Sequence, residues 1–202
     1  GLGPVTFARL LDQYGSPQQI LEYPGQLTGL SDAVVEGIRQ PDWQQVEADL
    51  TWLEIENRHI ITFDDARYPA LLKQISDPPY LLYVQGNVDL LSQWQLAIVG
   101  SRNPSASGRQ TAYDFARFLA GGGLTVTSGL AAGIDGAAHK GALAAGGKTL
   151  AVVATGLDRV YPARHRELAH QIAENGTIVS EFPLGTSPRP ELFPRRNRII
   201  SG

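Results

Sequence analysis

The chain has 202 residues, a formal net charge of −3 and no cysteine. The lack of cysteine excludes disulfide bonds, thiolate zinc sites and a cysteine nucleophile, and it fits a reducing cytoplasm. No apolar run approaches the roughly 18 residues of a membrane span, and no signal-peptide pattern opens the chain. We therefore expect a cytoplasmic protein that has no contact with membranes.

Charge is divided unevenly along the chain. Residues 1–97 carry 5 Lys and Arg against 13 Asp and Glu, a balance of −8, whereas residues 98–202 carry 12 against 7, a balance of +5. A basic segment attracts polyanions, although charge differences between domains can also serve solubility alone. The first interpretation is favoured because the basic residues lie in or beside the glycine loops described below.

Residues 1–58 are predicted to form a small helical domain. An apolar pattern at helical spacing covers residues 2–14, and the Gly-Ser-Pro sequence at 15–17 predicts the end of this helix and the start of another. Ser31 and Asp42 are candidate N-caps of two further helices.

The Gly-Leu-Gly turn at residues 1–3 is similar to the turn of helix-hairpin-helix modules, whose backbone amides hold a DNA phosphate. In an ordinary helical domain the same sequence is a plain turn. Because this part of the chain is acidic, we favour the plain turn and expect the domain to contact a partner protein.

Residues 59–202 are predicted to form an α/β domain in which strands and helices alternate. The expected strands are 59–63, 80–84, 96–99, 124–127, 149–154 and 177–180. The expected helices are a short one over 69–72 and longer ones over 108–120, 134–145 and 164–175. This order predicts a sheet that is largely parallel.

Three glycine-bearing loops each follow an expected strand and lead into an expected helix. They are Gly100-Ser101-Arg102, residues 128–135 and residues 155–159. In a parallel sheet such loops gather at the carboxyl edge. Glycines there let a ligand approach backbone N–H groups, and helix N-termini favour anions, so the pattern predicts a phosphate-bearing ligand.

Arg102 directly follows the first of these strands. A guanidinium in that place can bind a phosphate or stack on a base, and it can equally pair with a nearby carboxylate. The loop lacks the G-x-G-x-x-G fingerprint, because Gly100 is followed next by Gly108. A dinucleotide pyrophosphate site is therefore poorly supported.

The second loop offers a hydroxyl from Ser128, flexibility from Gly129 and Gly133, and N–H groups at the start of a helix. Asp135 and His139 lie one helical turn apart, which permits an acid–base dyad, half of a metal site or a structural pair that fixes the loop. The structural interpretation is favoured because no further metal ligand presents itself nearby, and we expect no metal and no catalytic residue.

The third loop contains Gly156, Asp158 and Arg159. Asp158 can act as a general base, but an Asp in such a loop more often forms a turn. Arg159 is a candidate for contact with a sugar-phosphate chain. Tyr161, just after the loop, can stack on a base or wedge the loop.

The segment 193–202 is strongly basic. Arg195, Asn197 and Arg198 follow an aromatic residue and a proline, and two apolar residues come next. Part of the segment must therefore point inward, towards the loops, and it is a candidate basic site. Phe193 can serve as a stacking platform of the kind that single-strand binders use, or as a core residue.

Together these motifs resemble the DNA-processing protein A family, DprA, also called Smf. The similarity covers essentially the whole chain. The matching residues are Asp65-x-x-Tyr68-Pro69, Asp77-x-Pro79, Leu82-Tyr83-x-x-Gly86, Gly100-Ser101-Arg102, Ser128-Gly129-x-Ala131-x-Gly133-Ile134-Asp135-x-x-Ala138-His139, Gly156-x-Asp158-x-x-Tyr161-Pro162 and Phe193-Pro194-x-Arg196-Asn197-Arg198-Ile199-Ile200.

The resemblance implies a fold and a function. The fold is a small all-α SAM-like domain followed by an extended Rossmann-like domain with a parallel or mixed sheet. The function is sequence-tolerant binding of single-stranded DNA, protection of incoming DNA and loading of the RecA recombinase during natural transformation, without turnover chemistry or cofactor. The DNA-binding residues it points to, with their basic neighbours, are Gly100, Ser101, Arg102, Ser128, Gly129, Gly133, Gly156, Arg159, Arg195, Asn197 and Arg198.

The chain departs from the family pattern at its end, because the family continues past the Arg-Asn-Arg motif with further sheet and helix. A homodimer is expected of the full-length protein, and the parts that support dimerisation and much of the RecA contact would lie beyond Gly202.

Two other functions share some of these features. A phosphoribohydrolase acting on nucleoside monophosphates has a similar sheet and phosphate edge, but it carries a Pro-Gly-Gly-x-Gly-Thr segment followed by Glu, which residues 154–158 lack. A nucleotide-sensing module with no role on DNA is the second alternative.

Overall fold

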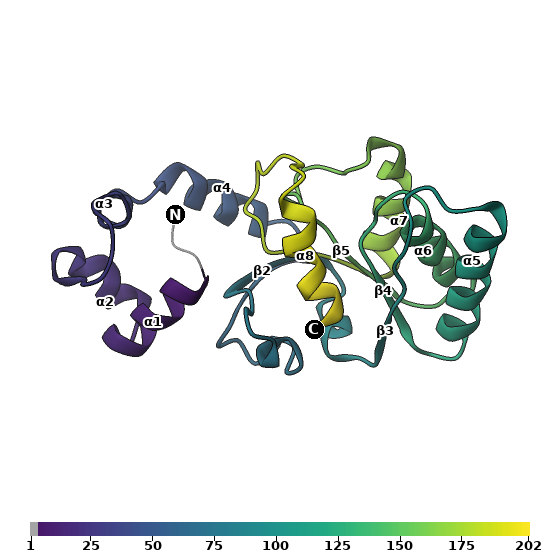
Figure 1. Cartoon of the computed structure of the whole chain (residues 1–202), viewed down its shortest axis with the longest axis horizontal. Helices are drawn as coiled ribbons and strands as arrows, with labels where there is room; N and C mark the ends of the chain where they lie inside the picture. Colours follow the sequence, from purple (N-terminus) through teal and green to yellow (C-terminus); the bar gives the residue numbers. More distant parts are fainter. Residues whose placement is uncertain (1–3) are drawn as a thin grey trace. The chain divides into compact units, whose positions relative to one another are not determined.

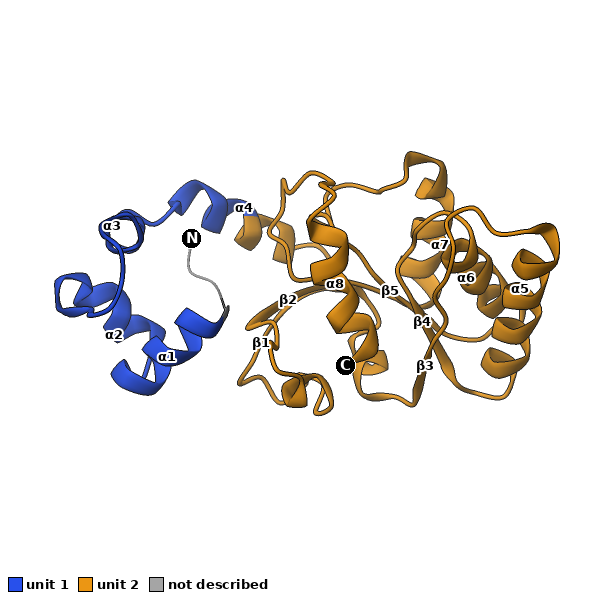
Figure 2. Cartoon of the chain, in the orientation of Figure 1, with its two compact units in different colours: residues 1–48 blue, residues 49–202 orange. Residues whose placement is uncertain are grey.

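The computed structural model describes residues 4–202, so the Gly-Leu-Gly turn at 1–3 lies outside the described residues. Figure 1 shows the chain, and Figure 2 shows its division into two compact units, up to residue 48 and from 49 to 202. The helix α4 (Trp43–Leu53) spans this boundary in sequence. Every helix of the described part is too short or too polar to cross a membrane.

The first unit is helical. It contains α1 (Pro4–Tyr14), α2 (Pro17–Glu22), the 3₁₀ helix η1 (Pro24–Gln26), α3 (Asp32–Arg39) and the first part of α4. Its buried residues are Leu10, Ile20, Leu27 and Ile38. The predicted cap of α4 is confirmed, because the Asp42 carboxylate accepts a hydrogen bond from the backbone N of Gln45 at 3.0 Å. Ser31 does precede α3, but its side chain makes no capping bond.

The second unit contains a mixed six-stranded sheet in the order β1-β2-β6-β5-β4-β3, which confirms the expected α/β fold. The four strands β3 to β6 are parallel, and β1 and β2 extend the sheet by antiparallel pairing. The strands are β1 (Arg58–Thr62), β2 (Leu81–Gly86), β3 (Gln95–Ala97), β4 (Thr125–Ser128), β5 (Thr149–Val152) and β6 (Thr177–Ser180). Each predicted strand is present, with ends that differ by up to two residues.

Helices cover both faces of this sheet. The helices α5 (Ala106–Gly121), α6 (Ile134–Ala144) and α7 (Arg166–Asn175) form one layer, and α8 (Leu192–Ser201) lies on the other face (Figure 1). The alternation along β5 shows the two faces, because Val152 packs in one core with Ile199 of α8, whereas Ala151 packs in another with Ile172 of α7. The 3₁₀ helices η2 (Leu72–Gln74), η3 (Val88–Ser92) and η4 (Ala163–His165) lie in the connections.

Sequence analysis did not predict α8. Part of the segment 193–202 was expected to point inward, but no helix was assigned to it; the helix buries Leu192, Arg196 and Ile199. These residues follow helical spacing, but an arginine interrupts the apolar face and hides the pattern. The short helix expected over 69–72 is instead the 3₁₀ helix η2.

Small residues let α5 and α6 pack closely. Ala116 and Ala120 of α5 meet Ala138 and Ala142 of α6 in one buried cluster. A Cβ at Gly141 of α6 would overlap the backbone of Tyr113 in α5. The helices can therefore keep this distance only with glycine at position 141.

We predict that Gly141→Ala lowers the free energy of unfolding by about 2 kcal/mol, because the added methyl group forces the two helices apart. Urea unfolding of the whole chain measures this change. Gly121→Ala is the matched control, because a Cβ there would meet the nearest atom, Ala145 Cβ, at an ordinary 3.8 Å. Equal stability of the two variants would contradict the close approach.

Candidate functional site

The carboxyl ends of β3, β4 and β5 bring the three predicted glycine loops to one edge of the sheet. The first two loops are joined directly, because the backbone N of Ile134 donates to the carbonyl of Ser101 at 3.1 Å. Gly156 in the third loop donates to the carbonyl of Thr186, at 3.0 Å, in the segment that follows β6. The predicted gathering of the loops at one edge is confirmed, and the first and second loops are also hydrogen-bonded to each other.

The glycines at this edge allow loops to approach each other. Gly133 has a φ of +85°, and a Cβ there would overlap the carbonyl oxygens of Ser101 and Arg102. A Cβ at Gly129 would overlap the guanidinium of Arg196. Gly100 and Gly156 are similarly crowded by protein atoms. The expected contact of these glycines with a ligand stays a prediction; in the structure their lack of a side chain lets parts of the protein approach each other closely.

The hydrogen-bond donors expected in the second loop are also used within the protein. The Ser128 hydroxyl is buried and donates to the carbonyl of Ile98 at 2.6 Å. The backbone N of Gly136 donates to Ala131 O at 3.1 Å. Contact of Ser128 with DNA therefore stays a prediction, while its position gives it a part in shaping the edge.

Asp135 and His139 have separate partners. The Asp135 carboxylate accepts a hydrogen bond from the backbone N of Ala131 at 3.3 Å, which fixes the second loop. His139 Nδ1 lies 2.7 Å from Thr149 Oγ1, whose own proton goes to the carbonyl of Val126. Nδ1 of the histidine therefore carries a proton, and because burial lowers the pKa of His139 the ring is neutral. Among residues 4–202, no three His, Asp or Glu side chains form a possible metal site.

Arg196 lies buried beneath the edge of the sheet. Its guanidinium donates to the carbonyl of Gly129 at 2.5 Å and to the carbonyl of Val152, and its Nε donates to Asn197 Oδ1 at 3.1 Å. Burial lowers the pKa of Arg196, and the charge of Asp135 opposes this effect. Sequence analysis selected its neighbours as site residues and missed this one, which ties the ends of β4 and β5 together.

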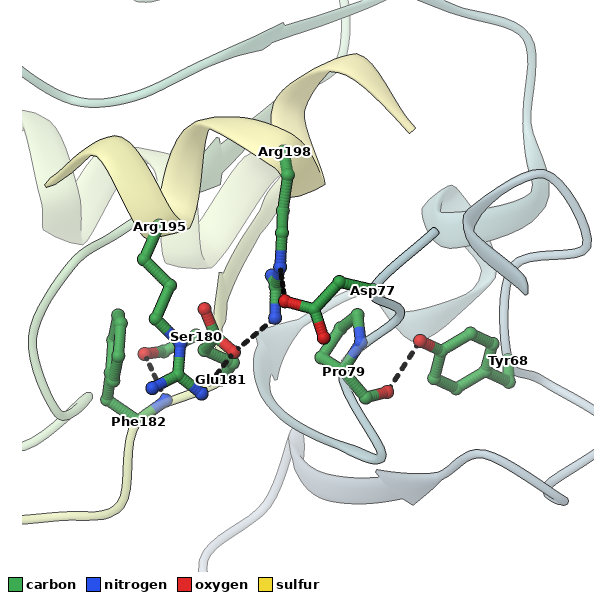
Figure 3. A network of polar contacts seen from close by, with 8 residues as sticks. All are labelled: Tyr68, Asp77, Pro79, Ser180, Glu181, Phe182, Arg195 and Arg198. Atoms are coloured by element: carbon green, nitrogen blue, oxygen red, sulfur yellow. Dashed lines mark hydrogen bonds and ion pairs between the residues drawn. The ribbon is translucent and has the colours of Figure 1, made fainter. Parts of the chain in front are cut away.

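Arg195 and Arg198 both bind Glu181, as Figure 3 shows. Arg198 Nη2 lies 2.7 Å from Glu181 Oε2, and Arg198 Nε lies 3.1 Å from Asp77 Oδ2. Arg195 Nη2 reaches the same oxygen of Glu181 at 3.2 Å. Two carboxylates thus neutralise two arginines that were predicted to bind DNA, while Asn197 between them is exposed.

Arg159 is likewise engaged. It pairs with Asp158 at 2.9 Å, and its Nη1 donates to Ser187 Oγ at 2.8 Å. The same Asp158 accepts from the backbone N of Gly185 at 2.8 Å. These contacts favour the turn-forming interpretation of Asp158.

Arg102 is exposed and lies beside two aromatic rings. Its guanidinium carbon lies 4.8 Å from the ring centre of Phe193, and that ring lies 5.7 Å from the ring of Tyr161. Tyr161 is 45% exposed. Within the described part of the chain, no carboxylate pairs with Arg102. The edge therefore presents an unneutralised cation next to an aromatic surface.

A polar cavity opens beside Arg102. Three further basic residues line it, Arg109, Lys140 and Arg164, together with the ring of Tyr113. Sequence analysis missed these three cations because they come from different helices and match no motif. The charge balance of residues 98–202 was the one signal that pointed towards them.

Comparison with known proteins places these features in a family. Residues 59–202 match the family model described as DNA recombination-mediator protein A. Protein Smf of Escherichia coli is 47% identical over 160 residues, which cover 79% of this chain and 43% of that protein. The chain spans about half the length of the curated relatives it matches.

Two solved structures resemble this one. DNA processing protein A (DprA) from Streptococcus pneumoniae has a TM-score of 0.70 and 34% identity, and the match covers 99% of this chain and 75% of that one. DNA processing protein A from Helicobacter pylori, described for its single-stranded DNA binding mode, has a TM-score of 0.64 and 32% identity. That match covers 70% of this chain and 64% of the other.

We predict that Arg198→Ala lowers the free energy of unfolding by about 3 kcal/mol, because it leaves the buried carboxylate of Glu181 without its shorter ion pair. Arg195→Ala is the matched control and should cost less than about 1 kcal/mol, since its side chain is 47% exposed. Urea unfolding of both variants measures whether the ion pair of Arg198 with Glu181 stabilises the fold. Equal, small losses would show that Glu181 does not depend on Arg198.

We also predict a pH dependence that arises from His139. Burial, with smaller contributions from the nearby His165 and Arg196, lowers the pKa of His139 from 6.5 to about 3. The unfolded chain therefore takes up this proton below about pH 6.5, while the folded chain does so only near pH 3. Stability should fall by roughly 1 kcal/mol per pH unit across that interval.

Urea unfolding at pH 7.5 and pH 5.0 tests this prediction. The stability of the wild type should fall more between the two pH values than that of His139→Gln, whose side chain does not titrate. An equal fall in both proteins would mean that His139 is protonated in the folded state.

Proposed function

Because the chain belongs to the DNA recombination-mediator protein A family, also called DprA or Smf, we propose that it binds single-stranded DNA along the carboxyl edge of its sheet. The family match covers residues 59–202, which include all of the predicted DNA-binding residues. The Helicobacter pylori relative, described for its single-stranded DNA binding mode, supports the choice of ligand.

The observation that carries the proposal is the exposed Arg102 beside Phe193 and Tyr161. A guanidinium can bind phosphate through two parallel hydrogen bonds, and aromatic rings stack on bases of any identity. Neither kind of contact reads the edges of base pairs, so the chemistry suits an unpaired strand and gives little sequence preference.

The predicted site residues take different parts in this proposal. Gly100, Ser101, Arg102 and Asn197 are exposed and available for direct contact, and Arg159 and Arg195 can contact phosphate while keeping their carboxylate partners. The remaining residues shape the edge from within the protein: Ser128, Gly129, Gly133, Gly156 and Arg198.

A binding role is favoured over the phosphoribohydrolase alternative. Asp135 and His139, the pair that sequence analysis considered for acid–base chemistry, bind separate partners inside the protein. The third loop also lacks the segment that such enzymes carry, and Asp158 is held by a backbone N and by Arg159. We therefore propose no catalytic residue.

For the whole protein, of which this chain spans about half the length of its relatives, we propose the role of a recombination mediator. It protects single-stranded DNA entering the cytoplasm during natural transformation, loads RecA onto the strand and acts as a homodimer. The family membership supports these proposals. The SAM-like character of the helical unit, expected from the same resemblance, stays a prediction.

We predict that Arg102→Ala weakens binding of an oligo-dT strand about ten-fold, because one charge-assisted contact of roughly 1–3 kcal/mol is lost. Fluorescence anisotropy of a labelled strand measures the affinity. Wild-type binding should also fall with salt, with a logarithmic slope near −0.7 for each phosphate neutralised.

Lys148→Ala is the matched control, because this exposed lysine precedes β5 and therefore lies at the opposite edge of the sheet. It should bind like the wild type. Preferential binding of duplex DNA, or a flat salt response with tight binding of AMP, would contradict the proposal and favour an enzyme or a nucleotide sensor.

A further inference from the structure

The cavity beside Arg102 has a volume of about 390 Å³ and lies between α5, α6 and η4. Arg109 projects from the first turns of α5, Lys140 from α6, and Arg164 from η4. Together with Arg102 they place four cationic side chains around one opening. No Asp or Glu is among the residues that line it.

These four cations are not neutralised by the protein. Among residues 4–202, none of them forms an ion pair or donates a side-chain hydrogen bond to another protein group. The carboxylate of Asp114 lies one turn along α5 from the lining residue Gln110 and accepts hydrogen bonds from it at 3.0 and 3.1 Å. The carboxylate of Asp114, the nearest acidic side chain on α5, is thus bound by the side-chain amide of Gln110 and pairs with none of the four cations.

Basic residues near the carboxyl edge of the sheet differ in this respect. Arg159, Arg195 and Arg198 bind carboxylates, whereas the cations around the cavity have none. Like charges gathered around one cavity repel each other, and an anion that enters relieves this repulsion. The cavity, rather than the Arg-Asn-Arg motif, holds the free positive charge near the edge.

The lining indicates which anion fits. Pockets for whole small molecules are mostly apolar, but most residues that line this cavity are polar or charged, and the exceptions are Tyr113, Ala137 and two glycines. A charged phosphate suits such walls better than a nucleobase does. Arg102 borders both the cavity and the proposed DNA-binding edge, so the two are continuous.

We propose that this cavity is a phosphate subsite for single-stranded DNA, in which Arg109, Lys140 and Arg164 bind a phosphate next to the one held by Arg102. The inference rests on the proposed function and adds three binding residues to it. The phosphate is either an internal diester of the strand or the monoester at its end, and both have the chemistry that the cavity takes.

The test is fluorescence anisotropy of labelled oligo-dT with the whole chain, comparing wild type with Arg109→Gln, Lys140→Gln, Arg164→Gln and the triple variant. All three residues are exposed, so the fold should persist, and thermal unfolding checks this. Each single variant should weaken binding about 3- to 10-fold. The triple variant should also lose about 0.7 from the salt slope for each phosphate that leaves the cavity.

Lys148→Gln serves as the control that removes one free positive charge from the opposite edge of the sheet. Two oligo-dT strands, one with and one without a 5′-phosphate, distinguish binding of a terminal phosphate from binding of an internal phosphodiester. If the cavity holds the end of the strand, the wild type binds the phosphorylated strand more tightly and the triple variant loses that preference. If it holds an internal diester, the triple variant weakens both strands equally.

The two proposals fail in different ways. A triple variant that binds as Lys148→Gln does, while Arg102→Ala still weakens binding, overturns the subsite and leaves the proposed function intact. If the wild-type chain does not bind single-stranded DNA, both the proposed function and the phosphate subsite are overturned.

Discussion

The buried guanidinium of Arg196 makes the contacts on which the shape of the carboxyl edge of the sheet depends. It binds the carbonyl of Gly129, just after β4, and the carbonyl of Val152, at the end of β5. Two neighbouring strands are therefore joined at their carboxyl ends by a side chain that comes from α8, on the face opposite to α6. Hydrogen bonds from a charged group are worth more than neutral ones, and a buried cation must keep its acceptors. The position of α8 and the shape of the glycine loops are thus set by the same group.

This arrangement also separates two uses of positive charge. Two arginines of α8 make contacts within the protein: Arg196 binds backbone carbonyls, and Arg198 binds Glu181 and Asp77. Arg102 at the edge, Arg109 of α5, Lys140 of α6 and Arg164 of η4 are left without carboxylate partners within the described residues. An exposed, unpaired cation contributes little to stability but is ready to bind an anion. Two arginines of the most basic motif in the sequence, Arg196 and Arg198, are thus engaged within the protein, and the cations without carboxylate partners lie elsewhere in the domain.

Much of the fold could be predicted from the sequence. The strands and the helices over 106–144 follow local patterns, namely β-branched runs, glycine stops and a cap at Ser105 that accepts from the backbone N of Gly108. The helix α8 could not be predicted, because Arg196 occupies a position on its apolar face and its burial depends on carbonyls that are distant in sequence. Local patterns carry no information about such partners.

The site was predicted less completely than the fold. The edge of the sheet and Arg102 followed from the order of strands and loops, because parallel strands bring their carboxyl ends together. The close contacts of the glycines within the protein could not be predicted, since they depend on which part of the protein lies opposite each glycine. Arg109, Lys140 and Arg164 could not be grouped either, because only the packing of α5, α6 and η4 brings them together.

The first two loops interlock in both directions. Gly133 of the second loop faces the carbonyls of Ser101 and Arg102, and Gly100 of the first loop faces the side chain of Ile134. A change in either loop must be accommodated by the other, so the effects of substitutions in the two loops are not additive. In evolution the two segments can then diverge only together, and a residue accepted in one loop depends on which residue already stands in the other.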